Sequence, residues 1–176
     1  AVAELTSFLD LPAEVILATK REDEIRSGKV AAKATMRLRL VFSNETKSGG
    51  TRSENLKRIR LAERFTDHVV KNGLKGAQLM PHEIVQKILE NYNISKMQEQ
   101  VLDAQWKDLW RNIGEQVTAK AAEDGAEFSP PRMVPLCDVS GSMSGVPMQV
   151  AIALSIGISE ITHDAFKNMV LTFETR

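Results

Sequence analysis

The chain has 176 residues, of which 43% are apolar, and its 23 basic and 23 acidic side chains balance formally. This composition predicts a buried core in one ordinary domain or two small ones, and it excludes a disordered polyampholyte. The single cysteine, Cys137, excludes an internal disulfide framework and favours a reducing, intracellular setting in the cytoplasm or the nucleus. Because no apolar run reaches the roughly 18 residues of a membrane span, we expect no membrane association.

The N-terminal stretch predicts one helix, one ambiguous segment and a loop. Proline suits the first turn of a helix, so Pro12 is expected to open a helix over Ala13 to Ile25. Lys29 to Phe42 leaves two alternatives open, because apolar residues alternate with arginines as in a strand whereas residues 30–34 favour a helix. The polar residues 43–53, which include two adjacent glycines, predict a loop.

The next three segments have helical periodicity and predict an antiparallel helical array. A helix from Glu54 to Lys71 is expected to stop at Asn72-Gly73, and a second helix to begin at Pro81. A third begins at Ser95, with a capping-box pattern, and Gly114 is expected to end or bend it. The apolar residues expected to be buried are Leu56, Ile59, Ala62, Phe65 and Val69 in the first helix, Ile84, Val85, Ile88 and Leu89 in the second, and Met97, Val101, Leu102, Trp106, Leu109, Trp110 and Ile113 in the third.

The pattern changes after a linker at residues 122–131, which contains one glycine and two prolines. Met133 to Cys137 predicts a short buried strand, Pro147 to Ile161 a helix packed on a sheet, and Met169 to Phe173 a second buried strand. A strand, a helix and a strand in this order imply a parallel sheet with a right-handed crossover. The fold class is therefore a mainly α-helical region over residues 1–125, followed by an α/β part over residues 126–176.

Basic residues are concentrated in one segment of the helical region. Between Arg26 and Arg64 there are eleven Lys and Arg against three acids. Such an excess marks either a phosphate-binding surface or a solvated basic face offset by acidic neighbours, and both alternatives stay open. The candidate nucleic-acid contacts in this segment are Arg37, Arg39, Arg52, Lys57, Arg58 and Arg60.

Oxygen-bearing side chains recur at alternate positions directly after the first predicted strand, at Asp138, Ser140 and Ser142. Open α/β sheets bind ligands at the carboxyl ends of their strands. One carboxylate and two hydroxyls are hard donors of the kind that Mg²⁺ prefers. The same residue types also cap helices, which is the structural alternative for this loop.

This loop resembles the metal-ion-dependent adhesion site of von Willebrand A domains, which has the pattern Asp-x-Ser-x-Ser. The longer run from Leu136 to Met148, together with Pro81-His82-Glu83-Ile84-Val85 and Ala104-Gln105-Trp106, resembles an uncharacterised family of plants and giant viruses. That family couples a helical region to a von Willebrand A domain, as in the Ro autoantigen. The resemblance covers roughly residues 79–173. It implies a helical array like the TROVE region of Ro in residues 1–125 and an incomplete, Rossmann-like von Willebrand A domain in residues 126–176.

The resemblance implies that Asp138, Ser140 and Ser142 are metal ligands for Mg²⁺ or Mn²⁺. It also implies a threonine from a second loop and an aspartate from a third, and Thr172 and Thr175 do not match that threonine. The chain ends at Arg176, directly after an apolar run, so we expect it to be part of a longer protein with only part of the metal site. We therefore expect weak metal affinity for this chain alone.

Two functions follow as hypotheses. In the first, the metal ion engages a carboxylate or a phosphate of a partner, and RNA binds the basic segment by analogy with the Ro autoantigen. In the second, the chain is a protein-interaction scaffold with no nucleic-acid role. We expect no enzymatic activity, because no catalytic pair is present and neither Ser140 nor Ser142 has the Gly-x-Ser-x-Gly context of a nucleophile.

Overall fold

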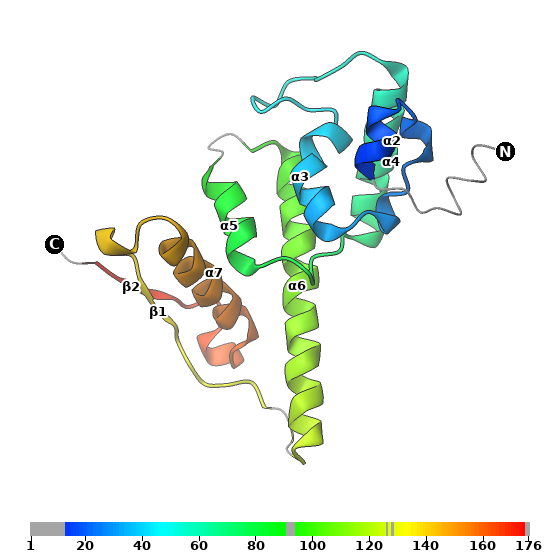
Figure 1. The fold of residues 1–176 in the computed structure, drawn as a ribbon. Coiled ribbons are helices and arrows are strands. Elements are labelled where there is room, and N and C mark those ends of the chain that lie inside the picture. Colours follow the sequence, from blue (N-terminus) through cyan, green and yellow to red (C-terminus); the bar gives the residue numbers. More distant parts are fainter. Residues whose placement is uncertain (1–12, 91–93, 126, 128, 175–176) are drawn as a thin grey trace. The chain divides into compact units, whose positions relative to one another are not determined.

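The computed structural model describes residues 13–90, 94–125, 127 and 129–174, and this part of the chain is mainly helical with a small parallel sheet near its C-terminus (Figure 1). The chain forms two compact units. Unit 1 lies within Ala1–Gln78 and Asn93–Gln105, and unit 2 within Leu79–Tyr92 and Trp106–Arg176. This division differs from the expected boundary at residues 125 and 126, because α5 and the later residues of α6 belong with the C-terminal part.

Unit 1 is a small helical assembly. Its elements are α2 (Ala13–Ala18), two 3₁₀ turns (Glu22–Glu24 and Ser27–Lys29), α3 (Ala32–Phe42), α4 (Leu56–Asn72) and the first residues of α6 (Lys96–Glu123). Helix α2 is shorter than the helix predicted to reach Ile25, and the expected role of Pro12 lies outside the described residues. The ambiguous segment is a helix, so its alternating apolar pattern did not indicate a strand.

The core of unit 1 is built from α2, α3, α4 and α6. The rings of Phe42 and Phe65 lie with their centroids 5.3 Å apart, and both side chains are almost fully buried. Burying two aromatic side chains removes a large apolar area from water and so stabilises the unit. The other buried core residues are Ala13, Ile16, Ile25, Leu61, Val69, Leu74 and Val101.

Helix α4 begins two residues later than predicted, because Asn55 is its N-cap and its side chain accepts a hydrogen bond from the Lys57 backbone. The predicted burial of Leu56 is wrong, because it is 69% exposed, and the buried face of α4 consists of Leu61, Phe65 and Val69. The predicted stop at Gly73 is confirmed by its positive φ of 67°.

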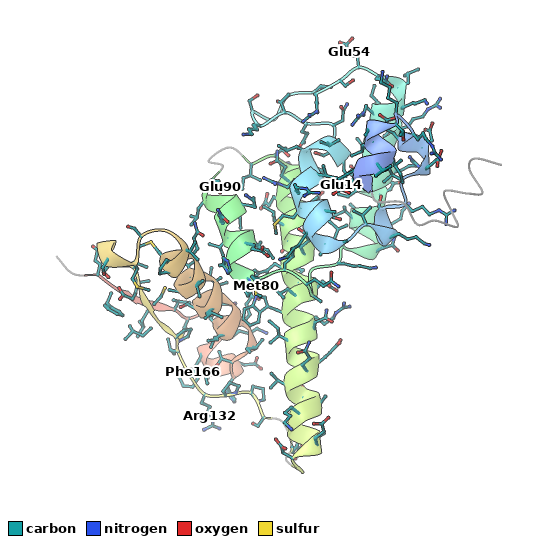
Figure 2. All side chains as sticks on the ribbon, in the orientation of Figure 1. Glu14, Glu54, Met80, Glu90, Arg132 and Phe166 are labelled. Carbon is teal, nitrogen blue, oxygen red and sulfur yellow. The ribbon has the colours of Figure 1, made fainter. Side chains whose placement is uncertain are left out.

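Unit 2 contains α5 (Pro81–Leu89), the residues of α6 from Trp106 onward, β1 (Leu136–Asp138), α7 (Val146–Ile161) and β2 (Leu171–Phe173). Helices α5 and α7 pack side by side. Figure 2 shows Met80 and Glu90 at opposite ends of α5. The backbone N–H of Met80 donates to the Glu83 carboxylate, which stabilises the start of this helix. On the predicted apolar face of α5, Ile84 and Val85 are buried, whereas Ile88 is 47% exposed and Leu89 is 50% exposed. Helix α6 continues through Gly114 without a break.

The two strands pair in parallel, as predicted, with Cys137 opposite Thr172. The prediction that both strands are buried is wrong. Cys137 is buried, but Leu136 is 64% exposed and Leu171 is 60% exposed. The physical reason is that the described residues cover these strands only in part, with no third strand beside them. Within the described residues, no helix is both long enough and apolar enough to cross a membrane.

Helix α7 lies close to α6 because it presents small residues at the contact. A β-carbon built on Gly157 would lie only 1.6 Å from Cζ2 of Trp110. The neighbouring Trp106 donates from its indole nitrogen to both carboxylate oxygens of Glu160, each at 3.1 Å. One tryptophan therefore occupies the space that the missing side chain leaves, and the other anchors the end of α7.

We predict that Gly157→Ala destabilises unit 2 by about 2–3 kcal/mol, because the added methyl group overlaps the Trp110 ring. Gly114→Ala is the matched control, since a β-carbon there meets no atom within 4 Å. That change lies in a helix interior and should stabilise by about 0.5–1 kcal/mol. Urea unfolding followed by tryptophan fluorescence reports unit 2, because it holds both tryptophans of the chain. Equal effects of the two substitutions would contradict the packing described.

Candidate functional site

The predicted metal loop follows the carboxyl end of β1. The backbone N–H of Val139 donates to the carbonyl of Phe173, which extends the parallel pairing one residue beyond the strand. The chain then forms a 3₁₀ turn over Gly141–Met143 and enters α7 through Gly145, whose φ of 88° suits a residue without a side chain. The loop is thus held between a paired strand and a packed helix.

The three predicted ligands come together in this loop. Oδ1 of Asp138 accepts a hydrogen bond from the backbone N–H of Ser140 at 2.9 Å, and the hydroxyl oxygens of Ser140 and Ser142 lie 3.1 Å apart. Ser140 is only 5% exposed, whereas Ser142 is exposed. The three side chains therefore form one polar cluster that is partly open to solvent.

None of these three side chains caps a helix. Ser140 is the N-cap of the 3₁₀ turn, but its side chain makes no capping hydrogen bond. The N-cap of α7 is Gly145, which has no side chain to cap with. The structural alternative for the loop, that its oxygens satisfy the start of a helix, therefore does not describe this geometry.

Hydrogen bonding keeps the Asp138 carboxylate ionised. The Ser140 hydroxyl first, and the Ser140 backbone N–H second, lower the pKa of Asp138 below its ordinary value. A second carboxylate, Glu174, follows β2 at the same edge of the sheet, because Phe173 is opposite Asp138 in the register. Two acidic side chains thus lie at the carboxyl ends of the two strands.

This donor set fits part of a site for a hard divalent cation. Asp138, Ser140 and Ser142 offer one carboxylate and two hydroxyl oxygens, which is the chemistry that Mg²⁺ and Mn²⁺ prefer. Among the described residues there is no cluster of three or more His, Cys, Asp or Glu side chains that could hold a metal ion by themselves. Any cation held here would bind the Asp138 carboxylate, the two hydroxyl oxygens and water.

Two of the candidate nucleic-acid contacts are used inside unit 1. Nε of Arg58 pairs with Oε1 of Glu22 at 2.8 Å, and the Glu22 side chain is only 6% exposed. Lys57 lies 3.8 Å from a carboxylate oxygen of Asp23 and donates to the carbonyl of Lys20. Arg64 donates to the backbone carbonyls of Glu22 and Asp23, so the acidic turn binds three cations of α4.

The remaining candidates differ in their exposure. Arg39 is only 7% exposed and donates to the carbonyl of Met36, so its position does not fit a nucleic-acid contact. Arg37 is exposed and pairs with Glu14 of α2. Arg52 and Arg60 are exposed. The structure therefore leaves two exposed arginines, out of six candidates, for which no ion pair is found among the described residues.

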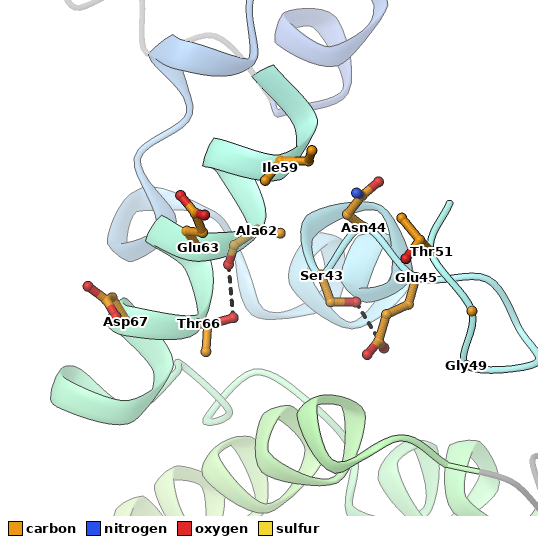
Figure 3. A pocket seen from close by; sticks show the side chains of 11 residues that line it. Ser43, Asn44, Glu45, Gly49, Thr51, Ile59, Ala62, Glu63, Thr66 and Asp67 are labelled. Atoms are coloured by element: carbon orange, nitrogen blue, oxygen red, sulfur yellow. Dashed lines mark hydrogen bonds between the residues drawn. The ribbon is translucent and has the colours of Figure 1, made fainter. Parts of the chain in front are cut away.

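Unit 1 also contains an open pocket of about 630 Å³ between α4 and the turn at residues 43–51 (Figure 3). Its lining includes the acidic residues Glu45, Glu63 and Asp67. One carboxylate oxygen of Glu45 already accepts hydrogen bonds from Ser43, Ser95 and Gln98. In Figure 3 the side chains of Glu63 and Asp67 point away from that of Glu45, so the three carboxylates do not converge.

Sequence reasoning missed three acidic residues that the structure gives a role, namely Glu22, Glu160 and Glu174. Glu22 and Glu160 have structural partners, Arg58 and Trp106, that lie 36 and 54 positions away in the chain. No local pattern reveals such pairs. Glu174 could have been found, because it directly follows the second predicted strand, where the ends of parallel strands meet.

The fold and the loop define a helical unit joined to a parallel α/β segment with oxygen donors at its strand ends. Residues 132–176 match a family described as "Domain of unknown function (DUF7788)". The chain is also similar to the uncharacterized protein L728 of Acanthamoeba polyphaga mimivirus, with 30% identity over 170 residues. The match covers 93% of this chain and 26% of the viral protein, so the chain spans about a quarter of that relative's length. No solved structure matches the chain. These matches support the predicted likeness to an uncharacterised, giant-virus-like family.

We predict that the pKa of Asp138, followed by carboxyl NMR, lies below the ordinary aspartate value of about 3.9. Ser140→Ala should raise this pKa, since it removes the larger of the two causes, whereas Ser144→Ala should leave it unchanged because that hydroxyl donates to Gly141. Because the folded-state pKa is lowered, the associated stabilisation is complete above the unfolded value and is lost as the pH falls through the folded value. An unchanged pKa in Ser140→Ala would contradict this account.

We predict that Arg58→Ala destabilises unit 1 by about 1–2 kcal/mol, because it leaves the buried Glu22 carboxylate without its guanidinium partner. Arg60→Ala, two residues along the same helix at an exposed position, should change the stability by less than about 0.5 kcal/mol. Urea unfolding followed by far-UV circular dichroism measures both variants. Equal stability of the two variants would show that the ion pair does not stabilise the unit.

Proposed function

We propose that this protein is a non-enzymatic, metal-dependent binding protein whose Asp138, Ser140 and Ser142 hold Mg²⁺ or Mn²⁺ and engage a carboxylate of a protein partner. The observation that supports the proposal best is the convergence of three hard oxygen donors that cap no helix. A bound cation would supply positive charge for an acidic partner group. The residues themselves would orient the cation, with Asp138 ionised at neutral pH.

The resemblance of the loop to a metal-ion-dependent adhesion site supports the same proposal. In a von Willebrand A-type arrangement the first loop follows a parallel strand and precedes a helix, as residues 138–146 do. We propose that unit 2 is the beginning of such a Rossmann-like domain.

Protein binding is the better-supported of the two hypotheses for the partner. The RNA hypothesis depended on an excess of basic residues, but Lys57, Arg58 and Arg64 bind the acidic turn at Glu22–Glu24. This is the offset of a basic face by acidic neighbours. We therefore propose a protein-interaction role without assigning a nucleic-acid surface to unit 1.

Paramagnetic Mn²⁺ tests the proposed metal loop even if its affinity is weak. We predict that Mn²⁺ selectively broadens the NMR amide signals of residues 138–146, and that excess Mg²⁺ reverses the broadening by competition. In Asp138→Asn, equal broadening should need a Mn²⁺ concentration at least about tenfold higher, because hard cations bind carboxylates far better than amides.

A pair of serine variants provides the control for this experiment. Ser142→Ala should weaken the Mn²⁺ effect, whereas Ser144→Ala, whose hydroxyl donates to the carbonyl of Gly141, should not. Broadening that is uniform over the chain, or equal in the two serine variants, would refute the proposed site.

A further inference from the structure

The carboxyl end of helix α4 holds a pair of residues that can react with each other without an enzyme. Helix α4 ends at Asn72, and the next residue is Gly73. The Asn72 side chain is exposed, and Gly73 has no β-carbon to crowd its own backbone nitrogen. A backbone nitrogen in this position can attack the side-chain carbonyl carbon of the asparagine before it. The pair is therefore a candidate site of spontaneous deamidation.

Two hydrogen bonds occupy the reacting groups while the helix is intact. The backbone N–H of Gly73 donates to the carbonyl of Val69 at 3.0 Å. The side-chain amide nitrogen of Asn72 donates to Nδ1 of His68 at 3.1 Å. Both acceptors lie in the preceding helical turn, so the two bonds direct both groups toward that turn. The reaction therefore requires the last turn of α4 to open first.

The last turn of α4 is held mainly by one buried side chain. Val69 is 5% exposed and belongs to the core of unit 1, whereas Val70 is 68% exposed. Lys71 pairs with Asp67 at 3.5 Å, but both side chains are more than 70% exposed, and such pairs stabilise a helix little. Helix ends with few buried contacts open more readily than the rest of a structure. The packing of Val69 therefore sets how often this turn opens.

We propose that Asn72 is a site of spontaneous deamidation whose rate is limited by opening of the last turn of α4. The backbone nitrogen of Gly73 forms a bond to Cγ of Asn72 and loses its proton, and the side-chain nitrogen leaves as ammonia. Water then opens the resulting five-membered succinimide ring at either of its two carbonyls. The product at position 72 is aspartate or isoaspartate, and water is the only co-reactant.

Either product weakens the end of α4. A new carboxylate at position 72 lies at the carboxyl end of the helix, where the macrodipole disfavours negative charge. Isoaspartate also inserts a methylene group into the main chain, which displaces the Gly73 N–H from the carbonyl of Val69. Because Val69 is part of the core of unit 1, the modification lowers the stability of that unit.

Peptide mapping by mass spectrometry tests the site after incubation of the 176-residue chain at mildly alkaline pH. We expect the mass increase of deamidation to accumulate at Asn72 faster than at Asn55, which is also exposed but is followed by Leu56. Unfolding the chain in urea should raise the rate at Asn72 about threefold to tenfold, because opening of the helix end no longer limits it.

Two neighbouring valines provide matched variants. Val69→Ala should raise the rate at Asn72 toward the rate in urea, because it removes part of the buried side chain that holds the last turn. Val70→Ala, at an exposed position, should leave the rate unchanged. Far-UV circular dichroism checks that both variants are folded. A rate at Asn72 no higher than at Asn55 would overturn the assignment of the site, and equal rates in the two variants would overturn the role of helix opening.

Discussion

The close approach of α6 and α7 at Trp110 and Gly157 is the constraint on which unit 2 depends. Trp110 lies where any side chain on Gly157 would have to be, so the two helices pack at this point only with glycine. The nearby bond from Trp106 to Glu160 holds the far end of α7. With α7 fixed by α6 and α5, and β1 fixed by its pairing with β2, the loop between them has little freedom.

Unit 1 shows why charge counted along a sequence differs from charge presented to a partner. The turn at Glu22–Glu24 and the cations of α4 are separated by more than thirty residues, and folding brings them into contact. Glu22 is buried while it pairs with Arg58, so that cation serves the stability of the unit. A local excess of basic residues therefore overestimates the positive surface.

Local patterns predicted much of the fold, and tertiary contacts decided the rest. The helices beginning at Pro81 and near Ser95, the parallel strands and the loop at Asp138 all have signals within a few residues. The alternation in Lys29–Phe42 left strand and helix open, because the covered face of this helix buries two polar side chains, Thr35 and Arg39, beside its apolar ones. Leu56 was misplaced because it lies on the opposite face of α4 from the buried residues Leu61, Phe65 and Val69. Burial of β1 and β2 could not be predicted from apolar runs alone, because it depends on which elements cover them.

The polarity of the loop favours a cation over a purely structural role. Hydrogen bonds from Ser140 stabilise the charged form of Asp138, and Glu174 adds a second negative charge at the same sheet edge. No cationic side chain between Val139 and Ser159 offsets these charges. The two hydroxyls beside this ionised carboxylate cap no helix, so helix capping does not account for the polarity of the loop. A hard cation from solvent would offset this negative charge, and its remaining positive charge would attract an anionic partner.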